Sequence, residues 1–94
     1  MGITKHDRIA KQIAEKKGTE YHSDKGVDIR TPRQVIEVEV DANTFKHGVR
    51  QLQGSDKARY LAVPNDLVKD AIDYTTGTGV GVMNEHGKMK KRAR

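Results

Sequence analysis

The strongest constraint on the fold is a pair of short segments in which apolar and polar residues alternate. They are residues 27–30, VDIR, and residues 34–40, QVIEVEV. Alternation with a period of two predicts a β-strand in each segment. The turn that joins them, residues 31–34, reads TPRQ, shares Gln34 with the second segment and contains turn-forming side chains. The sequence therefore predicts an antiparallel hairpin.

A four-residue loop fixes the pairing of this hairpin. Arg30 is expected to face Val35, and Asp28 is expected to face Glu37 two positions further along. Side chains at alternate positions point to the same face, so Glu39 joins Glu37. The opposite face is expected to carry the apolar residues Val27, Ile29, Ile36, Val38 and Val40.

One face of the hairpin would thus carry a row of carboxylates, formed by Asp28, Glu37, Glu39 and Asp41. Like charges that face each other across two strands destabilise a sheet. The row therefore needs raised carboxyl pKa values, open solvent or a bound cation, and Mg²⁺ prefers oxygen ligands of this kind. The alternative is that a half-exposed strand simply presents a polar face.

The rest of the chain predicts three helices and two further strand regions. Apolar residues follow helical spacing over 3–17, where Thr4 is a candidate N-cap and Gly18 a stop signal. A short segment, TEYH, follows this helix. Asn43 or Thr44 is expected to cap the second helix, which carries Phe45, Val49 and Leu52 and ends at Gly54.

The apolar segment ARYLAVP, residues 58–64, predicts a strand buried on both faces. Asn65-Asp66 then begins a third helix, which carries Leu67, Val68, Ala71 and Ile72. Residues 76–90, TGTGVGVMNEHGKMK, predict a glycine-rich strand and a terminal hairpin. The predicted fold class is α/β, with a mixed β-sheet flanked by helices and elements in the order αβββαβαβ.

Composition limits the possible functions. A chain of 94 residues is expected to form a single domain, 1–94. Its net charge of +5 favours a polyanionic partner. The absence of cysteine excludes thiolate metal sites and cysteine nucleophiles. No apolar run approaches the length of a membrane span and no signal-peptide core is present, so no membrane contact and a cytoplasmic location are expected.

A helix, then GVDI, a turn, IEVEV, a second helix and a buried strand together resemble the PD-(D/E)XK nuclease superfamily, in particular archaeal Holliday-junction-resolvase-like members. The resemblance covers residues from about Ile3 to Pro64. It implies a restriction-endonuclease-like fold and metal-dependent hydrolysis of phosphodiester bonds in DNA, with Mg²⁺ or Mn²⁺ as cofactor. By the same resemblance, Asp28, Glu37 and the backbone carbonyl of Val38 are the metal ligands.

Three further positions depend on this resemblance. The family has Lys where this chain has Glu39, which could act as a general base or a further ligand. Resolvase-like members carry an acidic residue on the first helix, and Asp7 occupies that place. The alternative for Asp7 is a capping box with Thr4. Gln51 matches part of a Gln-xxx-Tyr motif, but Ser55 stands where the Tyr would be.

Basic residues flank the acidic hairpin and the second helix, and they are expected to hold the DNA backbone: Arg30, Arg33, Lys46, Arg50, Lys57 and Arg59. Few aromatic residues are available to stack on single-stranded bases, so duplex or branched DNA is the expected partner. A domain this small offers little surface to a duplex, which favours a homodimer. Ordinary solvated charge is the alternative explanation for the basic residues.

Other features are weaker. The four histidines, His6, His22, His47 and His86, lack the spacing of a metal motif and are interpreted as surface residues, although His47 and Gln51 could share a helix face near the site. GTGVGV lacks a Walker lysine and is interpreted as a glycine-bearing strand. The basic segment 88–94 is expected to be a flexible tail or, alternatively, a phosphate-binding arm.

Three hypotheses follow. The first is a metal-dependent DNA endonuclease. The second is a catalytically inactive relative that binds nucleic acid or a protein partner through the same surface. The third is a protein-interaction domain in which the acidic strand face is only solvated.

Overall fold

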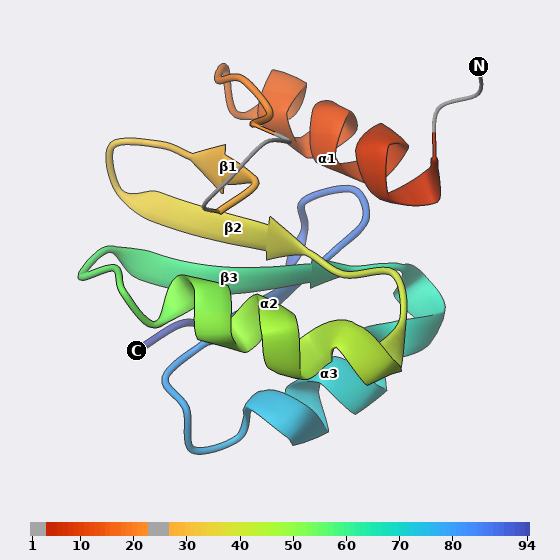
Figure 1. The fold of residues 1–94 in the computed structure, drawn as a ribbon, viewed down its shortest axis with the longest axis vertical. Helices are drawn as coiled ribbons and strands as arrows, with labels where there is room; N and C mark the ends of the chain where they lie inside the picture. Colours follow the sequence, from red (N-terminus) through yellow and green to blue (C-terminus); the bar gives the residue numbers. More distant parts are fainter. Residues whose placement is uncertain (1–3, 23–26) are drawn as a thin grey trace.

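The computed structural model describes residues 4–22 and 27–94. A mixed sheet of five strands is flanked by helices on both faces (Figure 1). The strands lie in the order β1-β2-β3-β4-β5, and both outer pairs, β1 with β2 and β4 with β5, are antiparallel. The inner pairs are parallel. The predicted α/β class with a mixed, helix-flanked sheet is therefore confirmed.

The element bounds follow the sequence patterns closely. The helices are α1 (Lys5–Lys16), α2 (Phe45–Leu52) and α3 (Val68–Thr75), and short 3-10 turns, Ala42–Thr44 and Asn65–Leu67, precede the last two. The strands are β1 (Ile29–Arg30), β2 (Gln34–Val38), β3 (Ala58–Val63), β4 (Gly81–Asn84) and β5 (Met89–Lys91). TEYH provides only an isolated bridge from Tyr21 to Ile29, so the order differs from the predicted αβββαβαβ.

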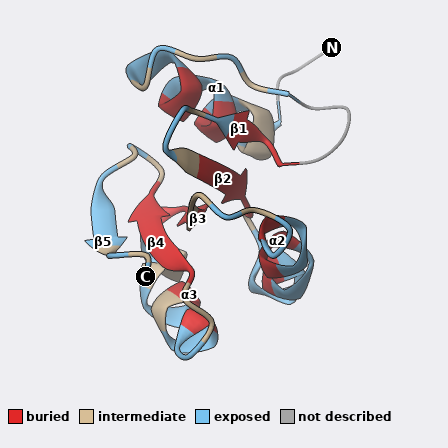
Figure 2. Ribbon diagram, turned by 90° about the vertical axis from the view of Figure 1, so that its left-hand side faces the viewer, coloured by how far each residue is buried: buried red, intermediate tan, exposed pale blue. Residues whose placement is uncertain are grey.

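The hydrophobic core has two halves, one on each face of the sheet. Helix α1 covers one face, where Ile9, Ala10 and Ile13 pack against strand residues that include Ile36 and Val38. Helices α2 and α3 cover the other face (Figure 2), and their core consists of Val27, Val35, Phe45, Val49, Leu52, Leu61, Val63, Ala71, Val80 and Val82. Strand β3 contributes to both halves, as predicted for a strand buried on both sides.

The predicted hairpin is present. Arg30 pairs with Val35, and the turn is held by Thr31, whose Oγ1 accepts hydrogen bonds from the amides of Arg33 and Gln34. Val27 differs from the prediction, because it packs beside Val35 and not on the face of Ile29. The regular strand begins only at Ile29, so the backbone bends at Asp28 and the alternation is broken there.

The predicted helix caps are right in one case of three. Thr4 caps α1 by accepting the amide of Asp7, and Gly18 follows the helix with φ of 69°. The second helical segment is capped by Asp41, which accepts the amide of Asn43, and not by Asn43 or Thr44. Pro64 stands at the cap position of the third segment and makes no side-chain capping hydrogen bond, while the amide of Asn65 donates to Oε1 of Glu85.

The segment 88–94, expected to be a flexible tail, contains strand β5 and pairs with β4 as the predicted terminal hairpin. Beyond the strand, the amide of Ala93 donates to the hydroxyl of Tyr60 and the amide of Arg94 to the carbonyl of Gly79. These long-range hydrogen bonds hold the basic segment against the sheet. No helix in the described ranges has the length and apolar character needed to span a membrane.

Candidate metal and nucleic-acid site

The predicted acidic residues of the hairpin are buried in this structure. Asp28, Glu37 and Glu39 are 7%, 5% and 7% exposed, respectively. Asp28 lies directly before β1, and Glu37 and Glu39 lie at the carboxyl end of β2. Among the described residues, the pairing of β1 with β2 extends only from Val35 to Ile36 along β2. The explanation that this strand face is simply solvated does not fit, because water is largely excluded from all three carboxyl groups.

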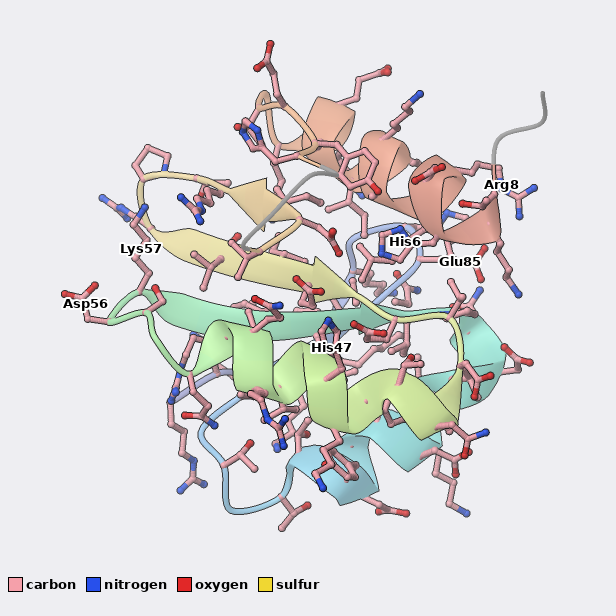
Figure 3. All side chains as sticks on the ribbon, in the orientation of Figure 1. His6, Arg8, His47, Asp56, Lys57 and Glu85 are labelled. Atoms are coloured by element: carbon pink, nitrogen blue, oxygen red, sulfur yellow. The ribbon has the colours of Figure 1, made fainter. Side chains whose placement is uncertain are left out.

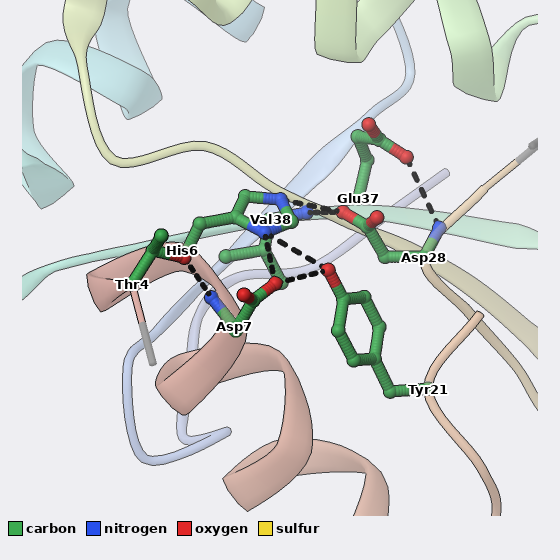
Figure 4. A network of polar contacts seen from close by, with 7 residues as sticks. All are labelled: Thr4, His6, Asp7, Tyr21, Asp28, Glu37 and Val38. Atoms are coloured by element: carbon green, nitrogen blue, oxygen red, sulfur yellow. Dashed lines mark hydrogen bonds and ion pairs between the residues drawn. The ribbon is translucent and has the colours of Figure 1, made fainter. Parts of the chain in front are cut away.

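Asp28 binds the carboxyl end of β2 through its own polar groups. Its Oδ2 accepts the amide of Val38 at 2.8 Å, while its amide donates to Oε1 of Glu37 at 3.2 Å (Figure 4). The two side chains were expected to stand directly opposite each other. They are linked instead through the Asp28 backbone, because the chain bends at this residue.

His6 approaches the same carboxylate from α1. Its Nε2 lies 3.1 Å from Oδ2 of Asp28, and this hydrogen bond raises the pKa of His6 to about 9. His6 is therefore not the surface histidine that the sequence indicated. The signal was present in the sequence, since His6 precedes Ile9, Ala10 and Ile13 by three, four and seven positions and belongs to their buried face.

Asp7 joins this network through Tyr21. The hydroxyl of Tyr21 donates to Oδ1 of Asp7 at 2.7 Å and lies 3.2 Å from Nδ1 of His6. The hydrogen bond from Tyr21 lowers the pKa of Asp7, while burial raises that of Tyr21. Asp7 thus takes part in only half of a capping box. Its amide binds Thr4, and its carboxylate faces Tyr21 (Figure 4).

The glutamates lie on the α2 side of the sheet. Burial raises the pKa of Glu37 to about 8, with a further contribution from the negative charge of Asp28. Burial also raises the pKa of Glu39, against the opposing effects of Thr44 and His47. Asp41 does not extend the acidic row, because it is exposed and caps the following turn.

Gly48 on α2 makes room for Glu39. A Cβ atom at Gly48 would lie 2.8 Å from Cγ of Glu39 and 2.8 Å from Cδ1 of Leu61. Any larger side chain would push the helix away from the strand or displace the glutamate. Sequence reasoning did not identify this glycine, since a glycine inside a helix gives no indication of which distant side chain it faces.

Two hollows contain residues from the predicted DNA-binding set. Arg30, Lys57 and Gln51 line a hollow of about 390 Å³ together with Val27 and Val35, which neighbour the carboxylates in sequence. Arg33 lines a different hollow, beside Lys16 and Lys17.

The other basic residues of the predicted rim lie on α2 and β3. Lys46 and Arg50 are exposed on α2. Arg59 binds Oε1 of Gln53 and the carbonyl of Thr78, next to the loop before β4. His47 lies on α2, where it is labelled in Figure 3, and it is exposed. Its positive charge opposes the rise in the pKa of Glu39.

The donor set consists of hard oxygen atoms, which is the chemistry Mg²⁺ and Mn²⁺ require. No group of three or more His, Asp or Glu side chains is placed to hold a metal ion within residues 4–22 and 27–94. The predicted ligand set differs from such a group, since it combines two carboxylates with the carbonyl of Val38. Comparison with protein-family models, with curated proteins and with solved structures found no match.

Proposed function

We propose that this protein is a metal-dependent DNA endonuclease of the PD-(D/E)XK type, acting as a homodimer on duplex or branched DNA. The observation that carries the proposal is the burial of Asp28, Glu37 and Glu39 together at the end of the hairpin. Burial and the negative charges of Asp28 and Glu39 raise the pKa of Glu37, and a bound cation would stabilise its ionised form. A net charge of +5 supports a polyanionic substrate.

Asp28, Glu37 and the carbonyl of Val38 would hold the ion. When bound, Mg²⁺ or Mn²⁺ would supply electrostatic stabilisation of the reacting phosphate and lower the pKa of a water molecule. Glu39 would accept a proton from the attacking water or complete the ligand set. His6 would hold Asp28 in position through its 3.1 Å contact, and Asp7 and Tyr21 would in turn fix the imidazole ring.

The basic residues would position the nucleic acid. Arg30 and Lys57, with Gln51, line the hollow beside Val27 and Val35, which pack on the α2 side of the sheet. Glu37 lies two positions after Val35 on β2, so strand alternation places it on the same face. Lys57 is fixed there by donating to the carbonyl of Thr31 at 2.9 Å. If a backbone phosphate bound in this hollow, the adjacent phosphates of the same nucleic-acid strand would lie along the hairpin, toward the acidic cluster.

The second candidate function is a catalytically inactive relative that binds nucleic acid through the same surface. The favouring observation is that Oδ2 of Asp28 already accepts the amide of Val38 and contacts His6. Those contacts satisfy this oxygen without a metal ion. Glu39 in place of the family's lysine supports the same interpretation.

Cleavage of linear, nicked and four-way-branched DNA in Mg²⁺ or Mn²⁺ tests the proposal, with wild type compared with Glu37→Ala and with Asp73→Ala. Asp73 is an exposed carboxylate on α3, outside both the acidic cluster and the hollow lined by Arg30 and Lys57. Metal-dependent cutting that is lost in Glu37→Ala and retained in Asp73→Ala supports the nuclease. Salt-sensitive DNA binding by wild type without cutting favours the inactive relative.

A further inference from the structure

A second charged hollow lies at the opposite end of the sheet from the carboxylates. It has a volume of about 300 Å³ and is lined by Thr76, Gly77, Gly79, Lys91, Arg92 and Arg94. Three of these six residues have cationic side chains, and none has an acidic side chain. The segment GTGVGV and the basic C-terminal segment, which are well separated in the sequence, meet here.

The loop before β4 provides the backbone side of the hollow. Gly77 and Gly79 have φ values of 84° and 81°, a conformation that favours glycine. Within the described part of the chain, neither of their amides donates a hydrogen bond to a protein acceptor. Both residues retain solvent access. The two N–H groups are therefore available to water or to a ligand.

The C-terminal segment is fixed beside this loop. The amide of Arg94 donates to the carbonyl of Gly79 at 3.0 Å, and Nζ of Lys91 donates to Oγ1 of Thr75 at 2.9 Å. Figure 2 shows the C-terminus between β5 and α3. Within residues 4–22 and 27–94, no carboxylate group lies at ion-pair distance from Lys91, Arg92 or Arg94.

Arg59 adds a fourth cation from beneath the loop. Its Nη2 donates to the carbonyl of Thr78 at 3.4 Å and lies 2.8 Å from the position a Cβ atom would take on Gly79. Burial lowers the pKa of Lys91, and repulsion from the nearby charge of Arg94 adds to this effect. An anion in the hollow would relieve this repulsion.

We propose that this hollow is a binding site for a phosphate group. The amides of Gly77 and Gly79 would donate to its oxygens, and Arg92 and Arg94 would provide charge-assisted hydrogen bonds. The phosphate would belong either to a small phosphorylated molecule or to a nucleic-acid backbone. This site is separate from the acidic cluster and does not depend on metal-assisted cleavage.

The test is a titration of the ¹⁵N-labelled protein with inorganic phosphate at constant ionic strength, in the presence of EDTA. We expect saturable chemical-shift changes at the amides of Gly77 and Gly79. Arg92→Gln combined with Arg94→Gln should weaken binding about tenfold or more, since two charge-assisted hydrogen bonds are removed. The matched control, Lys88→Gln with Lys90→Gln, removes the same charge from exposed positions outside the hollow.

The phosphate titration of the wild-type protein tests the proposal by itself, even if the double variant is poorly folded. Absence of saturable shifts at both glycine amides would overturn the proposal, and so would an equal loss of affinity in the control variant. A short DNA duplex that shifts the same amides and competes with phosphate identifies a nucleic-acid phosphate. Phosphate binding without such competition identifies a small phosphorylated ligand. Glu37→Ala should bind phosphate normally, which separates this site from the nuclease proposal.

Discussion

Nε2 of His6 lies 3.1 Å from Oδ2 of Asp28, so helix α1 and the acidic hairpin are joined by one contact between groups of opposite charge. His6→Ala should lower the free energy of unfolding by about 1 kcal/mol at neutral pH, because Asp28 loses a charge-assisted hydrogen bond in a partly exposed setting. Urea unfolding measures this change. The control, His22→Ala, removes an exposed imidazole and should change stability by less than about 0.5 kcal/mol.

The stability of the metal-free protein should fall as pH rises from about 5 to about 9. The pKa of Glu37 is raised from 4.5 to about 8, and that of His6 from 6.5 to about 9. In both groups the protonated form favours the folded state. Stability is thus fully present below the unfolded pKa values and is lost as pH rises through the folded ones.

Thermal melts in EDTA measure this pH dependence, and a fall in Tm of roughly 5 °C or more is expected. Glu37→Gln keeps an oxygen that can accept the amide of Asp28 but cannot ionise. It should therefore remove the part of the decline between about pH 5 and pH 8. A variant whose melting curve followed that of wild type over this range would show that Glu37 is not the titrating group.

Mg²⁺ or Mn²⁺ should raise the Tm of wild type, because a ligand that binds only the folded state stabilises it. The gain is about 2.7 kcal/mol at a hundredfold excess over Kd. Asp28→Asn and Glu37→Gln should each abolish the increase, whereas Asp41→Asn, at an exposed capping carboxylate, should retain it. The effect should grow as pH rises, since the ligands bind metal in their ionised form. An identical increase in all four proteins would exclude the acidic cluster as the metal site.

Gly48→Ala should destabilise the protein by about 1 kcal/mol or more. The new Cβ would lie 2.8 Å from both Glu39 and Leu61, and overpacking of this kind outweighs the gain of about 1 kcal/mol in helix propensity. Gly54→Ala is the matched control, because nothing lies within 4 Å of its Cβ position. In the Glu39→Ala background the Gly48 substitution should cost less, and additive effects would show that the two residues do not interact.

Several features followed from local sequence alone. The 3.6-residue period of Ile9, Ala10 and Ile13 determined the buried face of α1, and the four-residue loop at residues 31–34 determined the hairpin register. Thr4 was identified as the N-cap of α1 from its residue type and its position directly before the helix. Each of these features depends on residues that are close together in the sequence, so tertiary contacts were not needed to predict them.

Tertiary structure decided the surroundings of each carboxylate. Periodicity placed His6 on the inner face of α1, but only the packing of that helix brought it to Asp28. Because the backbone bends at Asp28, Val27 packs in the half of the core that α2 and α3 cover. Asp41 does not lie in the acidic row, because its side chain caps the following helical turn. Three further features depend on contacts between segments that are distant in the sequence, and no local pattern encodes such contacts. They are the burial of the carboxylates, the close approach of Gly48 to Glu39, and the packing of residues 91–94 beside Gly79.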